Sequence, residues 1–193
     1  MPNIVWLKNG NGDLSYTRKV TLTNLVKDGS FESGSPWVSG YSPDASEHIF
    51  GNKANKLSDT TIAQQALDVL PIVGHKYYGR EYIKSSGEIG AADMRFEIHG
   101  GDGVGLNWVF GLNSGNFANW SVISNIQTID AVNASSYNIR SFVVAAQNPA
   151  WIDGVMVIDL TEAFGAGKEP DKEWCDNYIP WFDGTIQLSL KGG

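Results

Sequence analysis

Residues 75–84, HKYYGREYIK, combine aromatic and charged side chains in a pattern that suits sugar recognition. Alternation along an extended strand puts Tyr78, Arg80 and Tyr82 on one face. Aromatic rings stack on the C–H faces of sugars, while cationic and amide groups donate hydrogen bonds to sugar hydroxyls. This face is therefore predicted to bind a carbohydrate.

Other residues could extend this face into a groove. Arg95, with Glu97 and His99, follows the same alternation in MRFEIHG (94–100), which we expect to be the neighbouring strand. The remaining candidates are Gln65 as an amide donor, Trp37 and Tyr41 at one end of the groove, and Trp108 or Trp120 at the other. Core packing is the alternative for each tryptophan, because tryptophan side chains are mostly buried.

A second group of residues offers oxygen ligands. Asp28, Ser30 and Glu32 alternate near the start of the first long strand, and Asp153 begins the last one. The first and last strands of a jelly roll can be neighbours, so these oxygens could converge on calcium, which takes about six to eight hard oxygen ligands. The alternative is that Asp28 caps a turn and Glu32 is solvated.

The stretch GAGK (165–168) raises the possibility of a phosphate-binding loop. A Walker loop needs a glycine five positions before the one that precedes its lysine, and a serine or threonine after the lysine. Here Glu162 occupies the first position, and Glu169 and Pro170 follow Lys168. The stretch is therefore not a nucleotide site, and we expect the segment around it to have a structural role.

The sequence gives little support for a catalytic site. A glycosidase needs two carboxylates that face each other across a cleft. Glu97 could be paired with Glu81 or Asp102, but strand parity puts Glu81 and Glu97 on opposite faces. Glu81 then falls on the core face, which requires a partner such as His75 or a register shifted by one residue. The histidines show no metal-binding spacing, and Cys175 has no paired histidine in its sequence context.

Composition limits the class of protein. A chain of 193 residues suits one domain with short appendages, and its net charge of −7 argues against nucleic-acid and membrane partners. A single cysteine allows no internal disulfide. The chain is rich in glycine and aromatic residues but only 18% charged, a profile typical of β-sandwiches that recognise sugars.

The sequence predicts an all-β fold, a β-sandwich jelly roll with a short C-terminal helix. The main strands are expected at 20–26, 60–67, 75–86, 94–100, 119–129, 137–146 and 150–160. A helix is expected at 170–179, because Pro170 suits its first turn and Pro180 ends it. About eight short strands without alternating helices favour a sandwich or jelly roll.

Residues 151–185 contain D-L-T, F-G-A-G-x-E-P, E-W-C-D and I-P-x-F-x-G-T in succession. This combination resembles a segment of tail proteins from phages and prophages of Gram-positive bacteria, where it ends a carbohydrate-binding-module-like jelly roll. Two upstream stretches, NLVKDGSFESG (24–34) and GHKYYGREYIK (74–84), resemble strands of the same modules, which are akin to carbohydrate-binding families four, nine and twenty-two of the galactose-binding-like fold.

The resemblance implies a non-catalytic module that recognises a host cell-wall or capsular glycan. It would work in the virion, as part of a phage tail assembled in the host cytoplasm, beside other tail or baseplate subunits and as a homo-oligomer. The alternative is a structural or decoration module without a glycan ligand. The resemblance also implies a structural calcium ion held by Glu32 and Asp153, with Asp28 and Ser30 lending backbone carbonyls.

Three parts are expected along the chain: an arm or hairpin at 1–23, the jelly roll at 24–160, and a C-terminal clasp at 161–193. The arm is a candidate for joining a neighbouring subunit, and the clasp, a short helix plus a final strand, would pack on the sandwich. An open face that carries Tyr78, Tyr82 and a tryptophan would favour glycan binding. The same face covered by the protein's own loops would favour a structural role.

Overall fold

The computed structural model describes residues 4–8, 14–58, 61–101, 107–143 and 148–192. Its strands are β1 (Ile4–Lys8), β2 (Leu14–Thr23), β3 (Pro43–Asp44), β4 (Ala54–Leu57), β5 (Ile62–Ala66), β6 (Lys76–Ser85), β7 (Glu88–Gly100), β8 (Asn107–Asn116), β9 (Ser121–Thr128), β10 (Tyr137–Val143), β11 (Ala150–Asp159) and β12 (Thr185–Gly192). Two short helices, α1 (Leu160–Phe164) and α2 (Lys172–Tyr178), lie between β11 and β12.

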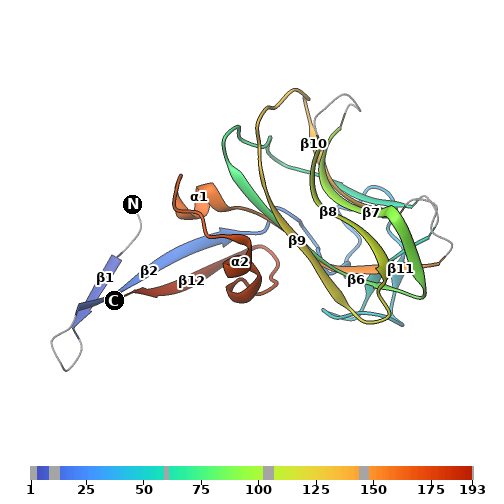
Figure 1. Cartoon of the computed structure of the whole chain (residues 1–193), viewed down its shortest axis with the longest axis horizontal. Coiled ribbons are helices and arrows are strands. Elements are labelled where there is room, and N and C mark those ends of the chain that lie inside the picture. Colours follow the sequence, from blue (N-terminus) through green and yellow to red (C-terminus); the bar gives the residue numbers. More distant parts are fainter. Residues whose placement is uncertain (1–3, 9–13, 59–60, 102–106, 144–147, 193) are drawn as a thin grey trace.

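The body of the molecule is a sandwich of two antiparallel sheets (Figure 1). One sheet has the order β5-β10-β7-β8 and the other the order β3-β4-β11-β6-β9. Apolar side chains from both sheets fill the space between them, among them Phe96, Phe110 and Ile152. The predicted all-β sandwich with a short C-terminal helix is confirmed. Strand β8 was not predicted, because asparagine and glycine, which are poor strand formers, make up half of it.

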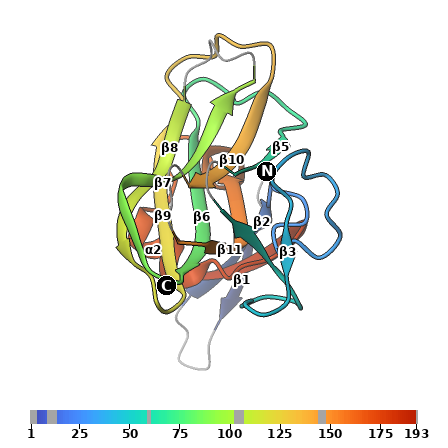
Figure 2. The ribbon, with the colours of Figure 1, turned by 90° about the vertical axis from the view of Figure 1, so that its right-hand side faces the viewer.

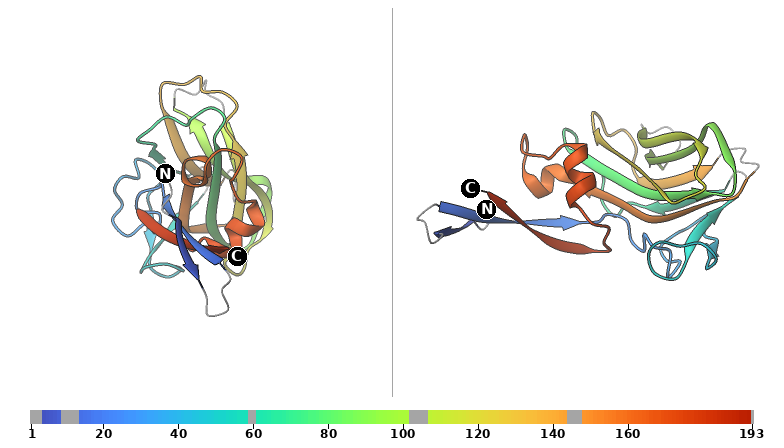
Figure 3. Two further views of the ribbon diagram at one scale, coloured as in Figure 1. Left: turned by 90° about the vertical axis from the view of Figure 1, so that its left-hand side faces the viewer. Right: turned by 60° about the horizontal axis from the view of Figure 1, so that its bottom comes forward.

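A three-stranded sheet, β1-β2-β12, forms an arm that projects from one end of the sandwich (Figures 1 and 3). Figure 2 views the molecule from the opposite end. Strand β12 pairs with β2 from Thr185, opposite Thr23, to Gly192, opposite Tyr16. The final strand therefore belongs to the arm sheet, whereas the sequence placed it in a clasp on the sandwich.

The two helices cover the outer face of the five-stranded sheet (Figure 1). Each begins at an aspartate whose carboxylate accepts a backbone N–H of the first turn: Asp159 caps α1 and Asp171 caps α2. The predicted helix at 170–179 is confirmed as Lys172–Tyr178. Within the described ranges, neither helix is long and apolar enough to cross a membrane.

A second apolar cluster holds these helices in place. It joins residues of β6 and β11 to residues of the helices and to the base of the arm: Val20, Leu22, Tyr78, Met156, Ile158, Leu160, Phe164, Cys175, Ile179 and Phe182. We call residues 160–182 the helical segment. Because its apolar side chains complete this cluster, the helical segment is an integral part of the fold.

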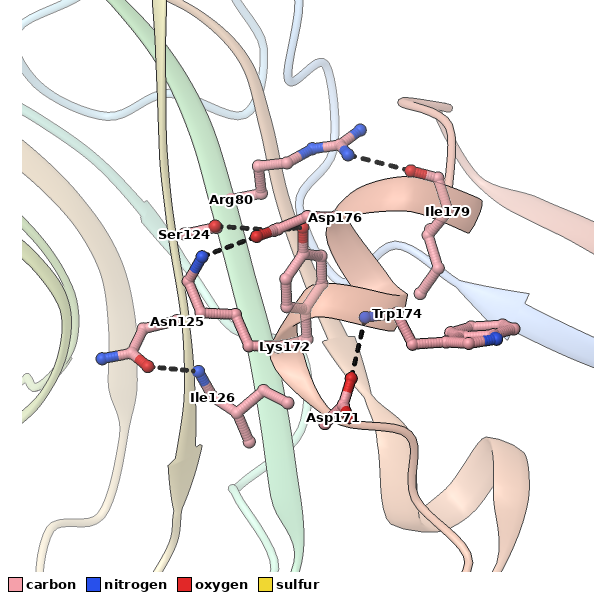
Figure 4. A network of polar contacts seen from close by, with 10 residues as sticks. Arg80, Ser124, Asn125, Ile126, Asp171, Lys172, Trp174, Asp176 and Ile179 are labelled. Atoms are coloured by element: carbon pink, nitrogen blue, oxygen red, sulfur yellow. Dashed lines mark hydrogen bonds and ion pairs between the residues drawn. The ribbon is translucent and has the colours of Figure 1, made fainter.

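Polar contacts fix the helical segment further (Figure 4). The Asp176 carboxylate accepts hydrogen bonds of 2.7 Å from the Tyr78 hydroxyl and from the Ser124 hydroxyl, and Lys172 donates to its other oxygen. The Arg80 guanidinium donates to the Ile179 carbonyl oxygen at 2.9 Å. Burial opposes ionisation of Asp176, but the hydrogen bonds outweigh it and lower the pKa of this carboxyl.

Candidate carbohydrate-binding face

The outer face of the four-stranded sheet lies opposite the helices and carries a cluster of polar side chains. Along β10, Tyr137, Ile139 and Val143 point into the core, so the residues between them face outward. The outward residues of β10 are Asn138, Arg140 and Phe142, and those of β7 are Arg95, Glu97 and His99. The predicted alternation of side chains along β7 is confirmed, because Met94, Phe96 and Ile98 all point into the core.

Pairing of β7 with β10 brings the charged residues together. Arg140 lies opposite Glu97 in the register, and its Nε donates to Glu97 Oε1 at 3.2 Å. Arg95 Nη1 lies 3.6 Å from Glu97 Oε2, and His99 Nδ1 lies 3.6 Å from Glu97 Oε1. One carboxylate thus faces two guanidinium groups and an imidazole. We call these four residues the Glu97 cluster.

The Glu97 cluster has unused hydrogen-bonding capacity. Glu97 is fully buried, yet its Oε2 has no hydrogen-bond partner among the described residues, and the same holds for His99 Nδ1 and Arg95 Nε. A change of register between Phe96 and Glu97, where β7 pairs with β8, interrupts the regular ladder at this point. Buried polar atoms are normally satisfied, so these three atoms indicate a place where a ligand or ordered water would bond.

An aromatic ring lies beside the cluster. The guanidinium carbons of Arg95 and Arg140 lie 5.7 and 5.2 Å from the centre of the Phe142 ring. Both distances are in the range of cation–π contacts, which hold the charged groups against the ring. The ring itself is only partly buried. The face therefore combines an apolar plate with fixed donors and an acceptor, as recognition of a sugar requires.

The face that the sequence predicted for this purpose is covered. Tyr78 and Arg80 do share a face of β6 with Tyr82, but Tyr78 is fully buried and Arg80 is 3% exposed. The helical segment lies over both, through the contacts to Asp176 and Ile179 described above. Tyr82 is half-buried, with its ring edge-on to Phe50 at 5.1 Å. The expectation of an open face on β6 is therefore wrong, because the chain's own C-terminal residues occupy it.

The sequence also placed β6 and β7 side by side, and this is wrong. Strand β6 pairs with β11 and β9, whereas β7 pairs with β10 and β8 in the other sheet. Arg95 consequently lies on the opposite outer face of the sandwich from Arg80. Ser86 and Gly87, which connect the two strands, lead from one sheet to the other instead of closing a hairpin within one sheet.

Three further candidates are engaged inside the protein. Gln65 is 1% exposed, and its amide accepts from the Lys27 N–H and donates to the Lys27 carbonyl, both at 3.0 Å. Trp37 is buried, and its ring stacks on Phe31 with centroids 4.6 Å apart. The Tyr41 hydroxyl donates to the Phe31 carbonyl at 3.0 Å, and burial raises the pKa of Tyr41. These residues fix loops in the structure and do not wall a groove.

The two remaining tryptophans differ from each other. Trp108 is 5% exposed within the sandwich core, and its indole N–H donates to Asp130 at 3.2 Å. The alternative expectation of core packing is thus the one that applies to it. Trp120 precedes β9 and is only partly buried. Its role in ligand contact stays a prediction.

Glu81 points into the core, as strand parity indicated, and is fully buried. Neither oxygen of its carboxyl group has a hydrogen bond of good geometry, although Ser141 of the facing sheet lies nearby. Burial raises the pKa of Glu81 to about 8, so the group is mostly protonated at neutral pH. The suggested partner His75 contacts Asp159 instead, at 2.7 Å. Glu81 and Glu97 therefore cannot act as a catalytic pair, and Asp102 lies outside the described residues.

The proposed calcium ligands fall into two groups. Asp153 and Glu32 approach the same loop: Asp153 Oδ2 accepts the N–H groups of Ile49 and Phe50 at 2.8 and 2.9 Å, and Glu32 Oε1 accepts that of Asn52 at 2.7 Å. Asp153 is fully buried and makes no ion pair within the described residues. Burial, together with the nearby Glu32 charge, raises the pKa of Asp153 to about 6.

A cation between Glu32 and Asp153 would offset their two negative charges, which is the basis on which these residues could hold calcium. All three carboxylates already accept backbone N–H groups, and that of Asp28 binds those of Glu32, Ser33 and Gly34 within its own turn. The Asp28 carbonyl is also engaged by Phe31 and Trp37, and Ser30 is buried in the same turn. Within the described residues no group of three or more acidic, histidine or cysteine side chains could hold a metal, so further ligands would be backbone carbonyls or water.

Sequence reasoning missed Arg140 and Phe142, although the signal was present. In the strand YNIRSFV, Asn138 and Arg140 alternate with apolar residues and share a face with Phe142, while the small Ser141 lies on the core face. That pattern predicts that one face of the strand is exposed to solvent. In contrast, AWIDGVMVID of β11 is almost continuously apolar, and all ten of its residues are buried. A comparison of the two strands could have assigned the open face to β10.

No family model matches the sequence, and no curated protein matches it. Solved structures do match its fold. A family 16 carbohydrate-binding module superposes with a TM-score of 0.53 at 18% identity, over 70% of this chain and 100% of the module. The first family 22 xylan-binding domain of Xyn10C from Paenibacillus barcinonensis gives 0.53 at 13% identity, over 72% of this chain and 92% of that domain. A further family 22 xylan-binding domain gives 0.51 at 14% identity, over 71% and 95%. The chain therefore has the jelly-roll fold of carbohydrate-binding modules.

Proposed function

We propose that this chain is a non-catalytic carbohydrate-binding domain whose ligand lies on the outer face of the β5-β10-β7-β8 sheet. The observation that carries the proposal is the Glu97 cluster beside Phe142, on the sandwich face opposite the helices. The fold shared with carbohydrate-binding modules supports it. Glu97 is the one carboxylate of the cluster, and no second carboxylate among the described residues faces it as glycoside hydrolysis would need.

Each group of the cluster has a distinct part in binding. The buried Glu97 carboxylate holds the two guanidinium groups in place, while Arg95 and Arg140, which are partly exposed, donate to hydroxyl or ring oxygens of the sugar. Phe142 stacks on the C–H face of a sugar ring. Gln64 lies opposite Arg140 on β5, and Asn138 lies opposite His99 on β10. Their half-buried amides add further hydrogen-bond donors for the sugar.

The biological context is a phage or phage-like tail, where the domain recognises a wall or capsular polysaccharide of a Gram-positive host. Support comes from the tail-protein resemblance of residues 151–185 and from the arm, which offers a means of joining other tail subunits. A single shallow site binds weakly. Many copies in one virion would raise the effective concentration of ligand and give useful avidity.

A structural calcium ion at Glu32 and Asp153 is part of this proposal. Its role is to hold the loop at residues 49–53 against β11, where the buried Asp153 carboxylate accepts backbone N–H groups but has no ion-pair partner among the described residues. The ion would stabilise the fold and take no part in glycan recognition.

The experiment is a calorimetric titration of purified protein with Gram-positive wall polysaccharides, first as soluble fragments and then with the protein clustered on beads. Arg140→Met should abolish measurable binding of the polysaccharide that the wild type recognises. Tyr82→Ala, on the covered face, is the matched control and should bind like the wild type. Loss of binding in Tyr82→Ala but not in Arg140→Met would overturn the assignment of the face.

The second candidate function is a structural module of the tail without a glycan ligand. The covered face of β6 favours it, because the first surface suited to sugars is used for internal packing. Failure of every wall polysaccharide to bind, even to clustered protein, would move the assignment to this function.

A further inference from the structure

A groove of about 660 Å³ lies between the base of the arm and the helical segment, away from the Glu97 cluster. The arm contributes Arg18, Ser189 and Leu190, and the helical segment contributes Phe164, Lys168, Trp174 and Tyr178. The volume of the groove suits a ligand of one or two sugar rings.

Three aromatic rings line the groove in succession. The rings of Trp174 and Tyr178 are one helical turn apart, with centroids 5.3 Å apart and planes tilted by 34°. Phe164 meets Trp174 edge-on at 5.7 Å and fixes the position of its ring. Tyr178 is 63% exposed, which is unusual for a large aromatic side chain. The pair formed by Trp174 and Tyr178 is thus a preformed platform for a flat apolar surface.

Two cations flank this platform. Arg18 Nη2 donates to the Phe164 carbonyl at 2.8 Å, which anchors the guanidinium, while its buried Nε has no partner in the described structure. Lys168 ends a turn in which its N–H donates to the Gly165 carbonyl at 3.0 Å, and its side chain is exposed. Neither cation forms an ion pair with any described carboxylate. In a chain of net charge −7, two unpaired cations thus line one aromatic groove.

We infer that this groove binds an acidic saccharide unit. The sugar ring stacks on Trp174 and Tyr178, and its carboxylate or phosphate group lies between Lys168 and Arg18. The site is independent of the Glu97 cluster, which lies on the other side of the sandwich and has its own carboxylate. The lysine of the GAGK stretch therefore binds an anion, although the stretch lacks the geometry of a nucleotide loop.

The test is calorimetric titration of the full chain with glucuronic acid and with glucose 6-phosphate, each compared with glucose. Binding of either acidic sugar at millimolar concentration, with glucose at least about threefold weaker, is expected. Binding of one acidic sugar alone identifies the carboxylate or the phosphate as the natural group. The interaction should weaken as salt is raised, because exposed charge pairs are screened.

Variants locate the site. Lys168→Met should weaken binding of the acidic sugar at least about threefold, and Tyr178→Ala by a similar factor. Lys27→Met removes one exposed charge elsewhere, is the matched control, and should not change the affinity. The inference is overturned if neither acidic sugar binds, if Lys168→Met binds like the wild type, or if adenosine monophosphate binds while both acidic sugars fail.

Discussion

The two outer faces of the sandwich differ in that one is covered by the protein's own chain and the other is open. On the five-stranded sheet, Tyr78, Met156 and Ile158 lie beneath the helical segment and are fully or almost fully buried. On the four-stranded sheet, the corresponding outward positions hold Arg95 and Arg140, which remain partly accessible. Both faces carry aromatic and cationic residues, so composition does not separate them.

The difference shows that a surface of aromatic and cationic residues can serve either internal packing or sugar binding. Arg80 on the covered face donates to a backbone carbonyl of the protein's own chain, and Tyr78 donates to its own Asp176. Buried polar atoms without a hydrogen-bond partner occur on both faces, among them Arg80 Nε on the covered face and Glu97 Oε2 on the other. Cover by the helical segment, more than residue type, therefore distinguishes the two faces.

The largest expected effect concerns stability of the covered face. Ile158→Ala should lower the free energy of unfolding by about 3 kcal/mol, because it opens a cavity under the helices. Phe142→Ala on the open face should cost no more than about 1 kcal/mol, since that residue is only partly buried. Urea denaturation measures both. Equal costs would contradict the contrast between the faces.

Glu81 provides a test of the core between the two sheets. Its pKa is raised to about 8 by burial, so the folded state holds the proton more tightly than the unfolded state, and stability falls as pH rises from about 4.5 to 8. Glu81→Gln removes this dependence and should be more stable than the wild type at pH 7, on the order of 2 kcal/mol. The gain should shrink toward pH 5, and a gain that did not vary with pH would contradict the buried position.

Replacement of Arg140 tests whether the open face binds a ligand or only supports the fold. Arg140→Met leaves the buried Glu97 carboxylate without its closest cation and should cost about 2 kcal/mol in chemical denaturation. The double variant Arg140→Met/Glu97→Leu should recover most of that loss without recovering polysaccharide binding. Recovery of binding in the double variant would show that the Glu97 cluster only supports the fold.

Substitution of Asp176 tests how much its hydrogen bonds stabilise the helical segment against the sheet. Asp176→Asn should destabilise the protein by about 1 kcal/mol at pH 7, because bonds from Tyr78, Ser124 and Lys172 to a charged acceptor are lost. The pKa of Asp176 is lowered, so its contribution is present above the unfolded pKa and disappears as pH falls through the folded value. The deficit of the variant should therefore vanish in strong acid; a deficit that persists there would assign it to packing.

The smallest expected effect is that of calcium. At pH 7 the ion should raise the melting temperature by a few degrees, and Asp153→Asn should abolish the rise. The pKa of Asp153 is raised to about 6, so stability without calcium falls as pH increases from about 4 to 6, and the calcium effect should fade below pH 6 as the carboxyl is protonated. An unchanged response to calcium in Asp153→Asn would exclude this site.

Local features of the fold could be predicted from the sequence. The alternation of side chains along the strands placed Glu81 on the core face and Glu97 on the outer face, and the two prolines that flank it located α2. The pairing of strands could not be predicted in the same way. A two-residue connection between β6 and β7 suits a hairpin, and only long-range contacts show that it links two sheets. The covering of β6 likewise depends on residues almost one hundred positions away.

The most direct test of the central claim is NMR mapping of polysaccharide binding by backbone amide and arginine Nε signals. The account predicts that a bound wall polysaccharide shifts signals of Arg95, His99 and Arg140 and of neighbouring residues in β7 and β10, while signals of β6 and β11 stay in place. Shifts confined to β6, β11 and the helical segment, with β7 and β10 unchanged, would contradict it.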